Sequence, residues 1–253
     1  METDRIAFTN SPWTLSVSGT QRELGVARLA VINDFVAQAL AVPQLGGSDV
    51  EILRPGEPLR DRPIGVIGPG TGLGVAGLIP LGGGRYRALP TEGGHASLAP
   101  GNRREQAVLE RLAGFFPHVS KERLVSGPGL LTLAKSLAEL DGAECAAATP
   151  QDVGRLAAAG DGHCLEATRM FSALLGAAAG DLALTYGARG GIYICGGVCL
   201  NLGPLFDRAA FAERFLAKGR MRGYLEPIPV WLVCRSQTGL LGAARFDFDD
   251  KAG

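Results

Sequence analysis

A run of alternating glycines in residues 68–74, Gly-Pro-Gly-Thr-Gly-Leu-Gly, constrains the fold of this chain more than any other feature. The apolar run 64–67 precedes it and the apolar run 75–81 follows it, so the sequence predicts two strands joined by a tight turn. Main-chain N–H groups exposed in such a turn can hold an anion. The turn therefore either holds phosphate through its backbone and the Thr71 hydroxyl, or it is simply a tight hairpin.

The spacing of these glycines differs from that of two familiar nucleotide-binding loops. A dinucleotide-binding loop would need glycine where Leu73 or Val75 stands, and the lysine that ends a P-loop is absent. Glycine is also abundant elsewhere, with 37 of 253 residues, roughly twice its usual share. Most of these glycines stand in clusters beside apolar runs, which indicates sites built from the backbone.

The other apolar runs predict an α/β protein. Strands are expected at 28–32, 64–67, 75–81, 86–89, 190–195 and 228–234, and helices at 35–42, 103–115, 129–140, 165–184 and 239–246. Residues 46–63 are polar and punctuated by proline, so we expect them to form a loop at the boundary between two lobes.

Composition excludes several classes of protein. The 25 basic residues balance the 25 acidic ones without blocks of like charge, so nucleic acid is not expected as a partner. The sequence shows no secretion signal and no apolar stretch long enough for a membrane span, which predicts a cytoplasmic protein without a membrane partner. Five cysteines without a CxxC pair predict neither a disulfide framework nor a metal site.

Asp34 stands where the expected strand 28–32 meets the expected helix 35–42. An aspartate at such a junction can cap the helix. Ligands of open α/β sheets bind beyond the carboxyl ends of strands, and a carboxylate near a helix N-terminus stays ionised and can accept a proton. Capping and catalysis are both open for Asp34, and one does not exclude the other.

Two further stretches have side chains suited to binding a sugar. In Glu92-Gly93-Gly94-His95, an acid and an imidazole flank two residues that let a polar ligand approach the backbone, although a surface turn explains the pattern equally well. Glu122 could be another acid of the same site, or a helix-surface glutamate near a capping Ser120.

Gly196-Gly197 directly follows the expected strand 190–195. Two residues without side chains at the carboxyl end of a strand allow a flat ring or a ribose to lie against the backbone. A simple turn between a strand and a helix is the competing interpretation.

Taken together, these motifs resemble the bacterial glucokinases, the hexokinase-like branch of the actin-like ATPase superfamily, from about residue 6 to residue 246. The cysteine-rich zinc signature of the related ROK sugar kinases is missing. The resemblance rests on Thr9-Asn10, Ile32-Asn33-Asp34-Phe35, 68–74, Leu89-Pro90 with Glu92-Gly93-Gly94-His95, 122–130, Cys195-Gly196-Gly197-Val198, Lys218-Gly219-Arg220, Ile228-Pro229-Val230 and Gly239-Leu240-Leu241-Gly242.

The resemblance implies a ribonuclease H-like, two-lobe α/β fold and ATP-dependent phosphorylation of glucose at its 6-hydroxyl, with Mg²⁺ bridging the phosphates. Asp34 would be the general base. Asn33, Glu92, His95 and Glu122 would bind glucose, Gly70, Thr71 and Gly72 would form the second phosphate loop, and Gly196 and Gly197 would line the adenosine pocket. The resemblance also suggests a homodimer.

The chain departs from the family at its start, because no Asp-x-Gly-Gly-Thr loop, the family's first phosphate loop, occurs before Asn33. We therefore expect an incomplete small lobe, with residues 1–44 as its remnant, 45–235 as the large lobe, and 236–253 returning as a helix to the small lobe. Two alternatives to a glucokinase stay open on this ground. One is a truncated, non-catalytic protein that binds sugar or regulates, and the other is an inactive fragment.

Overall fold

The larger of the two sheets forms the centre of the described structure, and the candidate site lies at its edge. The computed structural model describes residues 4–7 and 12–248, so Thr9 and Asn10 lie outside the described residues. Six strands form a sheet in the order β3-β8-β7-β4-β5-β6, where β7 runs parallel to both β4 and β8 and the other neighbours are antiparallel. These strands are β3 (Val50–Arg54), β4 (Ile64–Pro69), β5 (Leu73–Gly82), β6 (Arg85–Thr91), β7 (Ile192–Ile194) and β8 (Val230–Val233).

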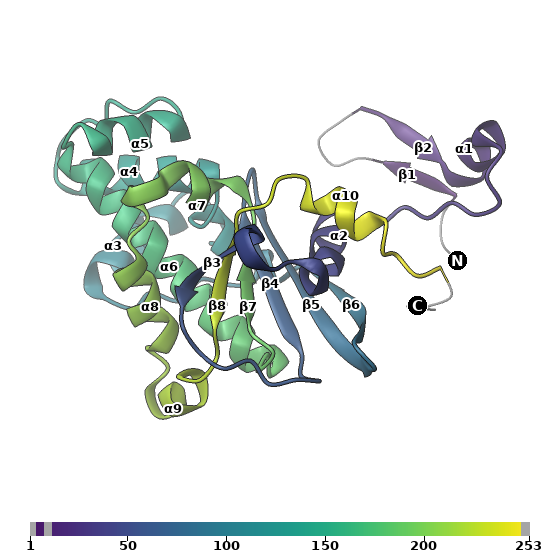
Figure 1. The fold of residues 1–253 in the computed structure, drawn as a ribbon. Coiled ribbons are helices and arrows are strands. Elements are labelled where there is room, and N and C mark those ends of the chain that lie inside the picture. The colour runs from purple at the N-terminus through teal and green to yellow at the C-terminus, as the bar shows by residue number, and fades with distance from the viewer. Residues whose placement is uncertain (1–3, 8–11, 249–253) are drawn as a thin grey trace.

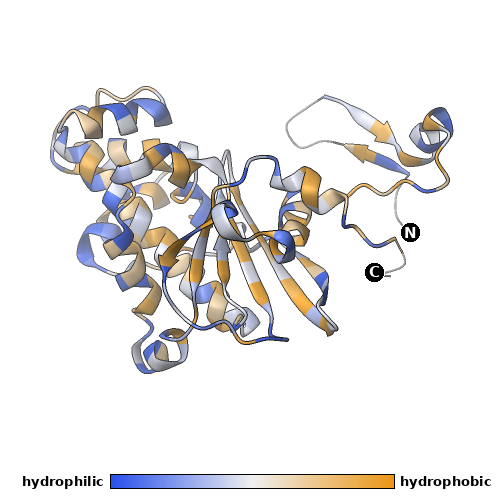
Figure 2. Ribbon diagram, viewed as in Figure 1, coloured by the Kyte–Doolittle hydropathy of each residue, from blue (hydrophilic) through white to orange (hydrophobic). Residues whose placement is uncertain are grey.

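Side chains of the central strands alternate between two apolar cores, as the pleat of a strand requires. Ile64 and Val66 of β4 belong to one core with Phe35, while Ile67 belongs to the other. A strand buried on both faces needs apolar residues at every position, which explains why β4 reads as a continuous apolar run. Hydrophobic residues accordingly follow the strands of this sheet (Figure 2).

Helices cover both faces of the sheet (Figure 1). One face carries α2 and α10, and the larger core on the other face contains residues of α3 to α8. These elements are α2 (Asp34–Ala41), α3 (Arg103–Ala113), α4 (Gly127–Leu140), α5 (Pro150–Ala158), α6 (Gly162–Tyr186), α7 (Gly197–Leu202), α8 (Arg208–Leu216), α9 (Arg222–Leu225) and α10 (Thr238–Ala243).

The longest helix, α6, packs on the face of the sheet that carries the larger core and contributes more residues to that core than any other element. Asp161 caps its N-terminus, and Gly187 ends it in the left-handed conformation at φ 60°. Helix α8 approaches α6 closely because Gly176 and Gly180 face the carbonyl oxygens of Phe211 and Phe215.

The first described residues form a separate arm. Strands β1 (Arg5–Ala7) and β2 (Thr14–Ser16) pair antiparallel and lead into α1 (Val17–Leu24). This arm projects from the body of the molecule beside α10 (Figure 1). Between the arm, α2 and β6 lies an apolar groove of about 560 Å³, and its lining includes Ile6, Val17 and Tyr86.

The structure confirms the α/β class and the glycine-linked hairpins at 64–91, and it corrects two expectations. Residues 28–32 are not a strand, because no described segment offers them a ladder partner. The expected loop 46–63 contains β3, which pairs with β8 at the edge of the sheet. Its charged residues, Glu51 and Arg54, hide the strand in the sequence because an edge strand needs only one buried face.

Helix α10 packs against α2, and Gly242 lies directly on the backbone of that helix. The division of the chain into lobes at 44 and 235 stays a prediction. Within the described residues, no helix is both long and apolar enough to cross a membrane.

Candidate active site

Asp34 occupies the first turn of α2 with its carboxylate exposed. The capping residue is Asn33, not Asp34, and its side-chain oxygen accepts hydrogen bonds from the N–H groups of Phe35 at 2.8 Å and Val36 at 3.2 Å. Asn33 has the non-helical backbone conformation of a cap, and Asp34 already belongs to the helix. The carboxylate of Asp34 is thus available for chemistry beside the positive end of α2.

Phe35 fixes the start of α2 over the ends of two strands. A Cβ atom on Gly74 of β5 would overlap the Phe35 ring, and one on Gly68 of β4 would come within 2.8 Å of it. Glycine is needed at both positions because the ring occupies the space of their side chains. Phe35 is itself buried. The position of Asp34 is therefore set by packing against β4 and β5.

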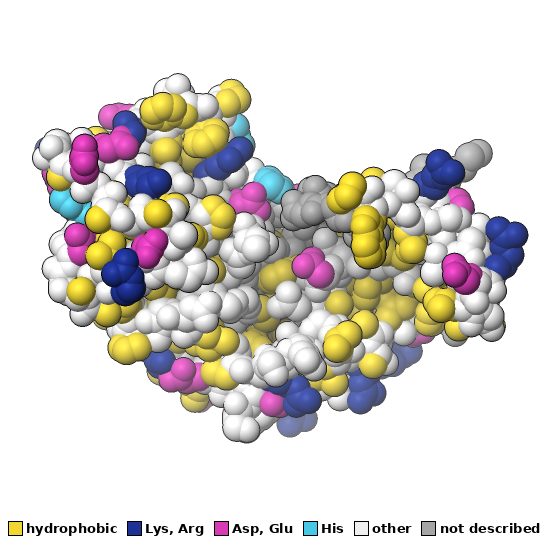
Figure 3. Space-filling model, turned by 90° about the horizontal axis from the view of Figure 1, so that it is seen from above, with side chains coloured by type: hydrophobic (Ala, Val, Ile, Leu, Met, Phe, Trp, Pro, Cys, Tyr) yellow, Lys and Arg dark blue, Asp and Glu magenta, His cyan; other side chains and the backbone are white. Residues whose placement is uncertain are grey.

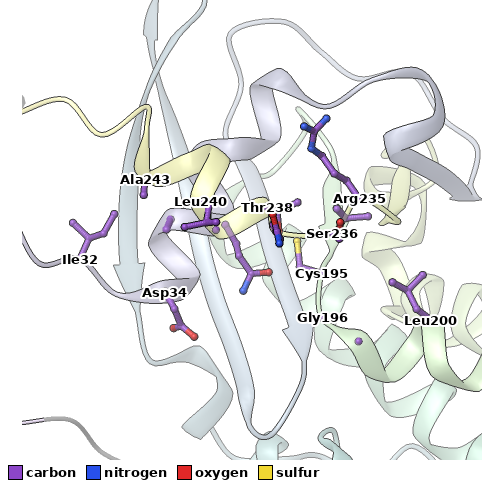
Figure 4. A pocket seen from close by; sticks show the side chains of 16 residues that line it. Ile32, Asp34, Cys195, Gly196, Leu200, Arg235, Ser236, Thr238, Leu240 and Ala243 are labelled. Atoms are coloured by element: carbon purple, nitrogen blue, oxygen red, sulfur yellow. The ribbon is translucent and has the colours of Figure 1, made fainter. Parts of the chain in front are cut away.

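Asp34 opens into a cleft of about 650 Å³ between α2, α10 and the end of β7 (Figure 4). Cys195, Gly196 and Gly197 line the same cleft. Gly196 has φ 87°, and a Cβ there would overlap the carbonyl oxygen of Pro69, so only glycine fits. Burial raises the pKa of the Cys195 thiol to about 12, which keeps this thiol protonated at neutral pH.

Sequence reasoning missed the far wall of the cleft. Residues 235–237, from the connection between β8 and α10, line it together with residues 238–240 of α10 itself. Ser236 lies on this connection and Thr238 begins α10, while the guanidinium of Arg235 pairs with Asp49 at 3.2 Å (Figure 4). Their signal in the sequence is their place directly after the run 228–234, because β8 is parallel to β7 and ends at the same edge of the sheet.

A second group of side chains gathers Glu92, His95 and Glu122. Nε2 of His95 lies 3.8 Å from Oε2 of Glu92, and Nδ1 lies 4.0 Å from Oε1 of Glu122. These separations exceed hydrogen-bond length, so the three side chains are not hydrogen-bonded to one another across these gaps and their facing atoms are left for a ligand. Glu92 is 80% exposed, His95 60% and Glu122 33%. We call these three residues the acid–imidazole cluster.

Glu122 joins this cluster to the glycine hairpin. Its Oε2 accepts a hydrogen bond from the N–H of Leu73 at 3.0 Å. The N–H of Gly70 donates to the carbonyl of Gly72 at 2.8 Å, which closes the turn. The interpretation of Glu122 as a helix-surface residue is wrong, because it lies in a 3-10 turn, Lys121–Arg123, and Ser120 makes no side-chain cap there.

The acid–imidazole cluster and Asp34 lie at the same end of β5. Gly94 sits against the carbonyl of Leu73, and Gly93 packs on Val75. Gly74 lies between Leu73 and Val75 in β5, and the ring of Phe35 packs against the opposite face of the strand at Gly74. Seen from above, the molecule is notched between its helical body and the N-terminal arm, and histidine and acidic side chains lie at the edge of this notch (Figure 3).

A mixed sheet covered by helices on both faces is the fold of the sugar kinases in the actin-like ATPase class, and solved structures share this fold. A glucokinase from an Antarctic psychrotroph superposes with a TM-score of 0.88 at 36% identity, over 97% of this chain and 76% of that one. A glucokinase from Balamuthia mandrillaris in complex with glucose, at 21% identity and TM-score 0.71 over 85% of this chain and 64% of that one, shares the fold.

The chain belongs to the glucokinase family. A family model described as Glucokinase matches residues 1–248. The glucokinase of Chromobacterium violaceum is 47% identical over 242 residues, which cover 95% of this chain and 69% of that protein. The glucokinase of Aromatoleum aromaticum is 45% identical over 245 residues, covering 96% of this chain and 74% of the relative. The expected ATP-dependent hexose kinase is therefore the class to which the chain belongs.

Proposed function

We propose that this chain is a cytoplasmic glucokinase that transfers the γ-phosphoryl group of MgATP to the 6-hydroxyl of glucose, with Asp34 as general base. The observation that carries the proposal is the exposed carboxylate of Asp34, which faces the cleft lined by Gly196 and Gly197. Because Asn33 performs the capping, the Asp34 carboxylate keeps its lone pairs for a proton. It takes the proton of the 6-hydroxyl while that oxygen attacks phosphorus and ADP departs.

The acid–imidazole cluster binds the remaining hydroxyl groups of the sugar. A carboxylate accepts hydrogen bonds from two neighbouring hydroxyls, and an imidazole donates or accepts one. Glu122 is oriented for this task by the N–H of Leu73. Asn33 contributes its amide nitrogen, because its oxygen is already occupied by the helix cap. Fixing the sugar in this way supplies the positioning on which phosphoryl transfer depends.

The glycines suit the nucleotide. Gly70 has open space where a Cβ would stand, so a phosphate oxygen can approach the backbone there, beside the Thr71 hydroxyl. The apolar stretch of the cleft beside Gly196 and Gly197 suits adenosine. No group of three His, Cys, Asp or Glu side chains among the described residues could hold a metal ion. Mg²⁺ commonly binds through substrate phosphates with few protein ligands, so we treat it as part of the nucleotide substrate.

Replacing one carboxylate oxygen of Asp34 with an amide NH2 group tests the proposal. Asp34→Asn should lower the rate of glucose 6-phosphate formation by about 10²- to 10⁴-fold, the usual contribution of a general base. The dissociation constant for glucose, measured by titration calorimetry, should change less than about threefold because the size of the side chain is kept.

The matched control is Asp61→Asn. Asp61 is exposed, precedes the opposite end of β4, and has a positive φ of 52° that asparagine also adopts readily. This variant should keep the parent rate. Normal turnover in Asp34→Asn would refute the role of the base. Glucose binding by the parent chain without any phosphorylation would instead support the non-catalytic, sugar-binding alternative.

A further inference from the structure

A carboxylate on the long helix α6 joins two lysines from distant parts of the chain. Oδ1 of Asp181 lies 2.5 Å from Nζ of Lys218, and Oδ2 lies 3.2 Å from Nζ of Lys121. Lys218 also donates to the carbonyl oxygen of Ala177 at 3.0 Å. Both lysine side chains are only 15% exposed. Asp181 is thus the shared counter-charge of two largely buried ammonium groups, whose burial is costly without it.

Lys121 directly precedes Glu122, and it is the point at which this ion pair reaches the acid–imidazole cluster. The backbone of the same turn is tied to the other half of the cluster, because the N–H of Lys121 donates to the carbonyl of Ala96 at 2.9 Å. Nε2 of His118 donates to the carbonyl of His95, also at 2.9 Å. The two segments that carry the cluster therefore form one unit, and Lys121 attaches that unit to α6.

We propose that Asp181 is a positioning residue for glucose binding, which acts by holding Lys121 so that the next residue, Glu122, keeps its carboxylate on Leu73. This inference rests on the proposed function, in which Glu122 binds a sugar hydroxyl. Without the Asp181 charge, the two lysines repel each other and turn toward water. The turn that follows Lys121 then shifts, and Glu122 loses its orientation. The sequence Lys218-Gly219-Arg220 gains a role here, since Lys218 holds Asp181 in place.

Titration calorimetry with glucose alone tests this inference without requiring turnover. Asp181→Asn and Lys121→Met should each weaken glucose binding by about 3- to 10-fold, because a small displacement of a binding group is costly. Lys121→Arg keeps the charge and should bind glucose within about twofold of the parent.

The matched control is Asp141→Asn. Asp141 is 43% exposed, against 40% for Asp181, and it pairs with Arg104 at 2.7 Å at the end of α4. That position is not part of the acid–imidazole cluster or of its hydrogen bonds. This variant should lower the melting temperature about as much as Asp181→Asn does, while its glucose affinity stays at the parent value.

A double-mutant cycle separates this inference from the proposed function. Glu122→Gln should weaken glucose binding, and adding Asp181→Asn to it should weaken binding no further, because Asp181 acts through Glu122. Additive losses, or an unchanged affinity in Asp181→Asn while Glu122→Gln binds poorly, would overturn the inference alone. Unchanged affinity in Glu122→Gln would overturn the sugar-binding role of Glu122 and the inference with it. If Asp181→Asn does not fold, equal glucose affinity in Lys121→Arg and Lys121→Met would overturn the inference.

Discussion

A methyl group at position 72 should displace the carboxylate of Glu122 without unfolding the protein. A Cβ on Gly72 would lie 2.5 Å from Oε2 of Glu122, and ordinary contact begins near 3.4 Å, so this oxygen must retreat by about 0.9 Å. The clash involves the flexible end of a side chain, not the backbone. Gly72→Ala should therefore leave the fold intact and break the 3.0 Å hydrogen bond from Leu73.

The expected loss follows from that hydrogen bond. A bond to a charged acceptor contributes about 1.5–3 kcal/mol to stability. Glu122 is 33% exposed, so water replaces part of the interaction, and we expect a net loss of about 1 kcal/mol. If this free energy is lost from glucose binding, because Glu122 is no longer oriented toward the sugar, the glucose affinity becomes about fivefold weaker. If it is lost from the free energy of unfolding instead, the melting temperature decreases by about 2–4 °C.

Titration calorimetry with glucose and thermal unfolding of the same variant measure these two quantities. Gly70→Ala is the matched control for glucose affinity, because it lies in the same turn and its Cβ would meet nothing within 4 Å. A glucose dissociation constant in Gly72→Ala equal to that of the control would refute the reasoning, since Glu122 would then tolerate displacement without consequence for the sugar.

Two further expectations concern stability. Hydrogen bonds from Arg155 and Thr149 lower the pKa of Asp152 to about 2, so its stabilising contribution is present above its ordinary value of 3.8 and is lost as the pH falls toward 2. The urea midpoint should fall over that range, and less steeply in Asp152→Asn; equal slopes would contradict this. Arg214→Met should lower the free energy of unfolding by about 3 kcal/mol, because it strips Glu105, which is 3% exposed, of its guanidinium partner. Urea unfolding should show partial recovery on adding Glu105→Gln, and a loss below about 0.5 kcal/mol would show that the pair contributes little.

Elements with local signals could be predicted from the sequence. The strands β4 and β5 are apolar runs bounded by glycine, and α6 is rich in alanine and leucine with few breakers, so each pattern is complete within its own segment. Strand β3 could not be found in this way, because its pairing with β8 depends on residues far along the chain. The prediction of a strand at 28–32 was wrong for the opposite reason. The apolar pattern fits a strand, but no described strand lies beside these residues.

In the candidate site, too, local signals could be predicted and contacts between distant segments could not. Asn33 and Asp34 are both good capping residues, and only the first residue of α2 decides which of them caps. The contact between Glu122 and Leu73 joins two distant turns and leaves no trace in local spacing. The family resemblance supplied Glu122 as a candidate, whereas the residues after β8 line the cleft because β8 is parallel to β7, a pairing that the run 228–234 does not itself show.

The contact between α2 and α10 determines when the site can be completed during synthesis. Gly242 of α10 lies against the carbonyl of Ala37 and the N–H of Ala41, so the backbones of the two helices touch. Chains emerge from the ribosome N-terminal end first. The helix that carries Asp34 is therefore made early but waits for residue 242 before its packing is finished. A nascent chain of this protein holds its carboxylate in the final position only after nearly all of the described residues have been translated.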